Sequence, residues 1–218
     1  MCGRLNQQLS IAEIRDAFGT KEADMEPISP GFNVPPTSHI YGVVGVAPRY
    51  IETFRWGLLP PWVKSVSPRY SMFNARADSV ATKRSYQAAF RSRRNLIPAV
   101  GFYEWQRIEG STQPFYIYRV DGTPLALAGL WEFNEVLGIG SSTIITTDAN
   151  DFMDPVHHRM PVVLEPEDWE VWLDPNNKDI AALQGLLRPA ADGVLTMHAV
   201  HPMVGDTRNN SAGVVAPF

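Results

Sequence analysis

Cysteine is almost absent from this chain of 218 residues, in which Cys2 is the single example. One thiol excludes an internal disulfide and a zinc site built from cysteines, and it fits a reducing, cytoplasmic environment. Long apolar runs are also missing, since no stretch approaches the roughly 20 residues that a membrane-spanning helix needs. The apolar segment 11–18 is too short for a secretory signal and has no basic leader. These absences predict a cytoplasmic protein without a membrane partner.

Basic charge is not in excess either. The net charge of −4 at pH 7 argues against a uniformly basic nucleic-acid binder, although the distribution of charge matters more than its sum. The window 69–94 carries +6, which leaves −10 for the rest of the chain. A polyanion could therefore bind one face and be repelled elsewhere, while the plainer alternative is a helix with a solvated arginine face. The window contains Arg69, Arg76, Lys83, Arg84, Arg91, Arg93 and Arg94, and one acid, Asp78.

Internal repeats and low-complexity tails are missing as well, and the remaining pattern is one of short elements. Ser10-Ile11-Ala12-Glu13 has the form of a capping box, which predicts a helix that Gly19 ends. Asp121-Gly122 between two apolar runs predicts a hairpin. Many short strands with few helices favour an α+β fold over βαβ repeats: a single domain, residues 1–218, with a mostly antiparallel, barrel-like sheet and a few flanking helices. The expected strands are 40–46, 49–56, 96–99, 102–107, 115–120, 125–130, 142–146, 162–164 and 194–200, and the further helices are 81–93, 166–173 and 180–187.

The position of the lone cysteine suggests a specific chemistry. If Met1 is removed, Cys2 carries a free α-amine and a thiol on neighbouring carbons. The amine can condense with an aldehyde to an imine, and the thiol can then close on the imine carbon to give a thiazolidine. An internal cysteine lacks the amine and cannot form this ring. The alternative is a small residue that only packs.

Three polar residues are candidates to assist such chemistry. Asn74 offers donors and an acceptor without charge, although a turn or helix cap is the simpler interpretation. In a strand, Glu104 shares a face with Phe102, and burial there would raise its pKa and suit it to proton transfer; a solvent-facing glutamate on an edge strand is the alternative. His157 is a natural proton shuttle. Since adjacent histidines point differently, His157 and His158 make a poor chelating pair, and we expect no metal site and no cofactor.

Trp62 follows two prolines in a rigid loop close to the basic window. An exposed aromatic beside arginines is typical of sites that hold single-stranded nucleic acid, in which bases stack and phosphates pair with guanidinium groups. A tryptophan that covers the core is the alternative.

Taken in order, these motifs resemble the SRAP family, the SOS-response-associated peptidase or abasic-site-processing proteins. The resemblance covers essentially the whole chain, including the closing segment 200–209. Pro35, Asp78 and His158 depart from the residues usual in the family, and His158 leaves open what orients His157. The matching stretches are Met1-Cys2-Gly3-Arg4, Phe32-Asn33-Val34-Pro35-Pro36-Thr37, Trp56-Gly57-Leu58, Asn74-Ala75-Arg76, Pro98-Ala99-Val100-Gly101-Phe102-Tyr103-Glu104-Trp105, Thr146-Thr147-Asp148-Ala149-Asn150 and His157-His158-Arg159-Met160-Pro161.

The resemblance implies a sensor of abasic sites in single-stranded DNA, which shields the site by a covalent thiazolidine cross-link through Cys2. Cleavage of the abasic strand as a lyase and removal of Met1 by self-processing are possible side activities. We expect a monomer that associates with DNA. The rival interpretation is an N-terminal-nucleophile peptidase or amidohydrolase, in which Cys2 attacks an amide. The resemblance assigns Cys2, Asn74, Glu104 and His157 to the chemistry and Arg4, Arg76 and Arg84 to DNA contacts, with Asn33 and Trp62 near the strand.

Overall fold

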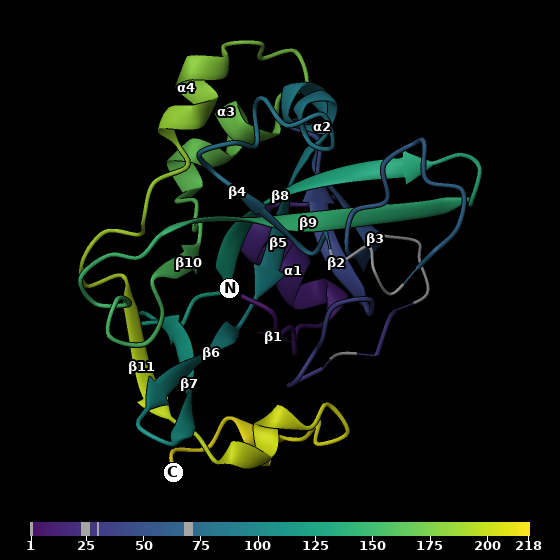
Figure 1. The fold of residues 1–218 in the computed structure, drawn as a ribbon. Coiled ribbons are helices and arrows are strands. Elements are labelled where there is room, and N and C mark those ends of the chain that lie inside the picture. Colours follow the sequence, from purple (N-terminus) through teal and green to yellow (C-terminus); the bar gives the residue numbers. More distant parts are fainter. Residues whose placement is uncertain (1, 23–26, 30, 68–71) are drawn as a thin grey trace.

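A closed barrel of five strands forms the centre of the molecule (Figure 1). The computed structural model describes residues 2–22, 27–29, 31–67 and 72–218, so Arg69 of the basic window lies outside the described residues. The barrel closes because β9 (Ile139–Asp148) pairs with both β3 (Tyr50–Trp56) and β8 (Leu125–Asn134). The pairing of β9 with β3 is parallel, and the other four pairings around the barrel are antiparallel. The predicted α+β class with a mostly antiparallel, barrel-like sheet is confirmed. In circuit order the strands are β2 (His39–Val44), β3 (Tyr50–Trp56), β9 (Ile139–Asp148), β8 (Leu125–Asn134) and β5 (Arg94–Ala99).

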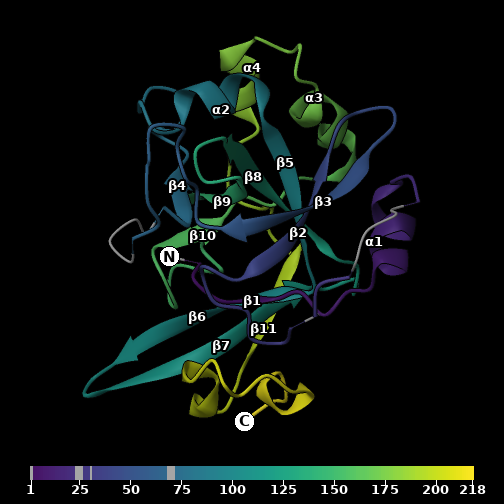
Figure 2. The same ribbon diagram turned by 90° about the vertical axis from the view of Figure 1, so that its right-hand side faces the viewer.

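A second sheet lies against one end of the barrel (Figure 2). Its two longest strands form a hairpin that projects away from the barrel, and the chain's N-terminal strand pairs with the first of them. Two short strands, β4 (Asn74–Arg76) and β10 (Arg159–Pro161), pair with opposite edges of β9 beyond the barrel circuit. The second sheet runs in the order β1 (Leu5–Asn6), β6 (Gly101–Ile108), β7 (Ser111–Arg119) and β11 (Leu195–Ala199).

The α-helices are short and lie on the outside of the barrel (Figure 2). The predicted capping box begins α1 (Ile11–Phe18): Ser10 Oγ accepts from Glu13 N at 3.2 Å, and Glu13 Oε2 accepts from Ser10 N at 2.7 Å. Gly19 ends this helix with a positive φ of 62°, a conformation that glycine adopts without strain. The other helices are α2 (Gln87–Ser92), η1 (Pro166–Asp168), α3 (Trp169–Leu173), α4 (Ile180–Gly185), η2 (Pro202–Gly205) and η3 (Ala212–Val214). Among the described residues, no helix combines the length and apolarity needed to span a membrane.

Three predictions of local structure were wrong. Asp121-Gly122 forms a turn, in which Asp121 Oδ1 accepts from Thr123 N at 2.9 Å, but the strands on either side do not pair with each other. β7 belongs to the second sheet and β8 to the barrel, so the turn carries the chain from one sheet to the other.

The helix predicted at 81–93 covers only Gln87–Ser92, because 77–86 is a series of turns in which Val80 and Tyr86 are buried against the core. The strand predicted at 162–164 lies at Arg159–Pro161; from residue 162 the chain leaves the β9 ladder toward β8, with a single bridge between Val163 and Leu127.

The basic window does not form one continuous face either. Arg94 is buried in β5, where its guanidinium donates to the carbonyl oxygens of Phe90, Trp172 and Asp174. Arg93 forms an ion pair with Glu132 at 2.6 Å. Counting charges along the chain overestimates the basic surface, because these two arginines hold the fold together.

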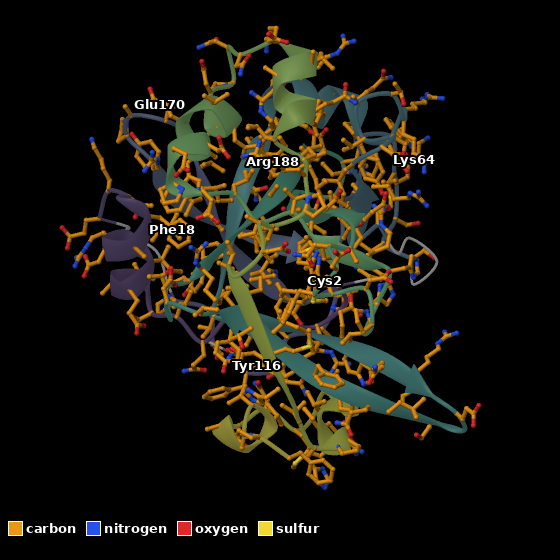
Figure 3. The ribbon with its side chains drawn as sticks, turned by 90° about the vertical axis from the view of Figure 1, so that its left-hand side faces the viewer. Cys2, Phe18, Lys64, Tyr116, Glu170 and Arg188 are labelled. Atoms are coloured by element: carbon orange, nitrogen blue, oxygen red, sulfur yellow. The ribbon has the colours of Figure 1, made fainter. Side chains whose placement is uncertain are left out.

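The core is divided between the barrel and the seam with the second sheet. One cluster contains Phe18, Phe90 and Trp172 beneath the helices. A second cluster, at the seam, includes Cys2 and Phe102. Figure 3 shows Cys2 inside the molecule, where the barrel meets the projecting hairpin. The seam therefore positions the chain's only cysteine.

Candidate active site and nucleic-acid interface

The N-terminal segment is held as an additional strand along β6. Leu5 and Asn6 pair with Phe102 and Gly101, and Tyr103 N donates to the Arg4 carbonyl at 3.0 Å. On the other side, Leu5 exchanges two backbone hydrogen bonds with Val34 at 3.0 and 2.8 Å. This pairing fixes the segment that carries Cys2 in one register.

The Cys2 side chain is fully buried in the chain that retains residue 1. Burial raises the pKa of the thiol, and the nearby Glu104 carboxylate raises it further, while a hydrogen bond from the Arg4 N–H opposes the rise. The thiol is therefore neutral near pH 7 in this state.

Asn74 lies at the start of β4 and reaches Cys2 directly. Its Nδ2 donates to the Cys2 carbonyl oxygen at 2.8 Å. In the chain with residue 1, the group that the Asn74 amide holds is therefore the Cys2 carbonyl. Asn74 Oδ1 is buried and has no hydrogen-bond partner among the described residues. Tyr86 donates its hydroxyl to the Asn74 carbonyl at 3.1 Å, which anchors the strand.

Glu104 lies on β6 close to the same cysteine. Its side chain is 3% exposed, and burial raises its pKa from 4.5 to about 7. The edge-strand alternative is wrong, because β1 and β7 flank β6 on both sides and Tyr103, on the opposite face from Glu104, is buried as well. A carboxyl group with such a pKa can both accept and donate a proton near neutral pH.

His157 belongs to the loop between β9 and β10, which Gln106 of β6 holds through a hydrogen bond to the Pro155 carbonyl at 3.0 Å. Its Nδ1 lies 3.0 Å from the Arg159 backbone nitrogen and 3.1 Å from the Arg159 carbonyl oxygen, so the Arg159 backbone holds this ring nitrogen in either neutral tautomer. Contrary to the expectation that the two histidines point differently, their rings stack at a centroid distance of 4.5 Å and an angle of 21°, because they lie in an irregular turn. Burial lowers the pKa of His157. The Arg159 backbone and the His158 ring together orient this histidine.

Arg4 and Asn33 contact each other next to the chemical residues. Arg4 Nη1 donates to Asn33 Oδ1 at 2.8 Å, and the Arg4 guanidinium lies 5.7 Å from the centre of the Trp105 ring. The Asn33 side chain is buried and is hydrogen-bonded to carbonyls of the C-terminal segment. The resemblance implied that Asn33 lies near the strand; in the structure its side chain contacts Arg4 and the C-terminal segment.

Trp62 is exposed, at 47% of its surface, so it does not cover the core. The exposed Arg84 guanidinium lies over its ring at 5.1 Å. Arg76 is also exposed, but it forms an ion pair with Asp78 that lowers the pKa of that carboxyl. The loop that carries Trp62 is fixed by Asn134, whose Nδ2 donates to the carbonyls of Pro60 at 2.8 Å and Val63 at 2.9 Å.

The structure thus brings Cys2, Asn74 and Glu104 together, with His157 in the adjoining loop. Within the described ranges, no group of three or more His, Cys, Asp or Glu side chains could hold a metal ion. Sequence reasoning missed Asn134 and Arg159, a buried arginine that pairs with Asp148 at 2.8 Å. The one local signal for Asn134 was a polar residue next to the apolar run of β8.

Comparisons with known proteins agree on one family. The protein-family model described as SOS response associated peptidase (SRAP) matches residues 1–207 of this chain. The abasic site processing protein YoaM of Bacillus subtilis is 34% identical over 97% of this chain and 96% of the relative. The abasic site processing protein HMCES of Xenopus tropicalis is 28% identical over 99% of this chain and 78% of the relative. A crystal structure of a protein from Bacteroides thetaiotaomicron, 23% identical, covers 100% of both chains with a TM-score of 0.88 and supports the fold.

Proposed function

The chain belongs to the SRAP family, and from this membership and the geometry of the site we propose that it processes abasic sites in single-stranded DNA. In this proposal, removal of Met1 frees the Cys2 amine, and Cys2 forms a covalent thiazolidine with the ring-opened sugar. The relatives named as abasic site processing proteins support abasic sites as the substrate. The adduct would shield the lesion from other reactions.

One observation carries the chemical part of the proposal. Asn74 and Glu104, from β4 and β6, meet at Cys2: Asn74 Nδ2 holds the Cys2 carbonyl at 2.8 Å, and the Glu104 carboxylate is close enough to raise the pKa of the thiol. The buried Asn74 Oδ1, without a hydrogen-bond partner among the described residues, supports a further role as an acceptor for the α-amine of a processed Cys2. A cysteine that only packs needs neither group.

The reaction balances with these groups alone. His157 assists opening of the sugar hemiacetal by moving a proton, which releases the aldehyde. The neutral Cys2 amine attacks the aldehyde carbon, and Glu104 supplies the proton with which the hydroxyl leaves as water. The Glu104 carboxylate then takes back the proton that the nitrogen loses as the neutral imine forms. The thiol then adds to the imine carbon, and its proton passes to the nitrogen as the C–S bond forms. If the ring does not close, the imine acidifies the neighbouring C2′ protons, and β-elimination would cut the strand.

The DNA would be held outside this seam by Trp62 and the exposed arginines. A base that stacks on Trp62 would displace or share the Arg84 guanidinium, which now lies 5.1 Å from the ring centre. Arg76 would exchange its Asp78 partner for a phosphate. Because the rest of the chain is acidic, electrostatic repulsion would keep the strand on this face.

The rival peptidase interpretation makes a different demand on Asn74. For cleavage between Met1 and Cys2, an oxyanion donor would have to face the carbonyl of residue 1. Asn74 Nδ2 instead engages the carbonyl of Cys2. This contact favours the cross-linking mechanism over an amide-cutting one that uses Asn74.

The decisive experiment uses processed protein and an oligonucleotide with one abasic site. We expect a heat-stable adduct on a denaturing gel, with the intact mass of protein plus DNA less one water. Cys2→Ala should abolish the adduct, and Cys2→Ser should reduce it to background, since a hydroxyl closes the ring far less readily. Undamaged DNA is the control. An equal adduct with Cys2→Ala would overturn the mechanism, and amide turnover without adduct would favour the peptidase.

A further inference from the structure

The C-terminal part of the chain folds back to contact Arg4 and Asn33. Residues 201–210, which we call the clamp, lie beneath the hairpin of β6 and β7 (Figures 1 and 2). After the clamp the chain is tied back to β11, where Val200 bridges Pro217 and Phe218 N donates to the Ala199 carbonyl at 2.9 Å. The clamp is therefore a fixed part of the fold.

Asn33 joins the clamp to the rest of the site through several hydrogen bonds. Its Nδ2 lies within hydrogen-bond distance of three clamp carbonyls, those of Val204 at 3.1 Å, Asp206 at 3.1 Å and Asn209 at 2.7 Å. Its backbone N–H donates to Asn210 Oδ1 at 2.9 Å. The side chain is 2% exposed, so these bonds form away from water.

The other end of the Asn33 amide holds Arg4. Arg4 Nη1 donates both to Asn33 Oδ1 and to the Val204 carbonyl, each at 2.8 Å. Trp105 lies against the same guanidinium. Two hydrogen bonds from one nitrogen and an aromatic ring restrict the guanidinium to one position.

Arg4 is also tied to Cys2 through the backbone. The Arg4 N–H bonds the Cys2 thiol, and the Arg4 carbonyl accepts from Tyr103 N at 3.0 Å. The position of the Arg4 side chain thus relates the reactive end of the chain to any phosphate that Arg4 contacts.

We propose that Asn33 is a positioning residue: together with the backbone of residues 204–209, it fixes the Arg4 guanidinium where it meets a DNA phosphate beside Cys2. This inference rests on the proposed function. It assigns the clamp a role in DNA recognition without direct contact with DNA.

The test compares Asn33→Ala, Arg4→Ala and the double variant in binding undamaged single-stranded DNA across a range of salt concentrations. If Asn33 acts through Arg4, each single variant should bind about tenfold more weakly. Each should also lose about 0.7 units of the slope of log affinity against log salt, as expected for one phosphate contact with a single strand. The double variant should lose no more than either single one. Additive losses, or an unchanged slope with Asn33→Ala, would overturn the proposal.

Asn209→Ala is the matched control, because it removes one clamp hydrogen bond, from Nδ2 to the Met203 carbonyl, without touching Arg4. Amide hydrogen exchange of residues 3–6 should become faster with Asn33→Ala and stay unchanged with Asn209→Ala. Equal exchange rates in the two variants would overturn the proposal that Asn33 and the clamp fix Arg4. If Asn33→Ala does not fold, Asn210→Ala offers a milder change with the same expected direction. If the Asn33 and Arg4 variants show this non-additive effect on DNA binding but the protein forms no adduct at abasic sites, only the proposed covalent function is refuted and the positioning role of Asn33 stands.

Discussion

Replacing Glu104 with glutamine should change how the stability of the protein depends on pH. Burial raises the pKa of Glu104 from 4.5 to about 7. A carboxyl group of this kind holds its proton more tightly in the folded state than in the unfolded chain. Its contribution to the free energy of unfolding is therefore fully present below about pH 4.5, the unfolded value, and is lost as the pH rises through about 7.

The size of the effect follows from the shift. One pKa unit corresponds to about 1.4 kcal/mol, so the rise from 4.5 to about 7 amounts to about 3 kcal/mol of lost stability. Glutamine does not titrate and keeps an uncharged amide in the same space. Relative to the parent, Glu104→Gln should therefore gain about 3 kcal/mol between pH 4.5 and pH 8.

Denaturant unfolding at several pH values measures this difference. Intact mass establishes that all samples share the same N-terminal residue, because a free amine beside Glu104 would alter its titration. Glu109→Gln, at the exposed tip of the hairpin, is the control and should follow the parent. Parallel stability curves for the parent and Glu104→Gln would refute the argument that burial sets this pKa.

Three further predictions concern the surface, the core and the thiol. Trp62→Ala should weaken binding of single-stranded DNA by about tenfold or more, since stacking contributes about 1–3 kcal/mol per base; fluorescence anisotropy measures it, with the exposed Val66→Ala as the control. Arg94→Met should lower the free energy of unfolding by about 3 kcal/mol or more, because buried carbonyls lose their hydrogen-bond donor. Denaturant unfolding measures this loss, and Arg91→Met, a change at an exposed position, is the control that should alter stability little. A thiol-specific alkylating reagent should modify Cys2 slowly while residue 1 is present, because the thiol is buried and its pKa is raised. Mass spectrometry should show faster modification of Cys2 after Met1 is removed. Equal rates would contradict the argument that removal of Met1 opens the Cys2 thiol to the reagent.

Local signals in the sequence were reliable where the interaction itself is local. The Ser10 capping box and Gly19 lie within ten residues of each other and define α1 as predicted. The hairpin predicted at Asp121-Gly122 was wrong because its turn is local while the pairing of the flanking strands is not. Closure of the barrel depends on the pairing of Arg55 with Ser141, a contact between distant segments that no periodicity encodes.

The same distinction applies to the site. Chemistry and strand alternation made Asn74 and Glu104 candidates, and the family resemblance assigned them to the site. The fold places both at Cys2. The positions of Asn33 and Arg94 could not be foreseen, because each binds carbonyl oxygens of segments far away in the sequence. Backbone carbonyls carry no residue identity, so the sequence contains no signal for such partners.

Burial of Glu104 also decides whether the proposed chemistry can run near neutral pH. An α-amine must be neutral to attack an aldehyde, and its ordinary pKa is about 7.7–8.0. Proton transfer from the ammonium to a carboxylate of pKa 4.5 would cost about 4.5–5 kcal/mol, at about 1.4 kcal/mol per unit. At the pKa of about 7 that Glu104 has in the chain with residue 1, the same transfer would cost only about 1 kcal/mol. The electrostatic cost of burying Glu104 in the seam is thus what would make it an effective base for the amine of Cys2.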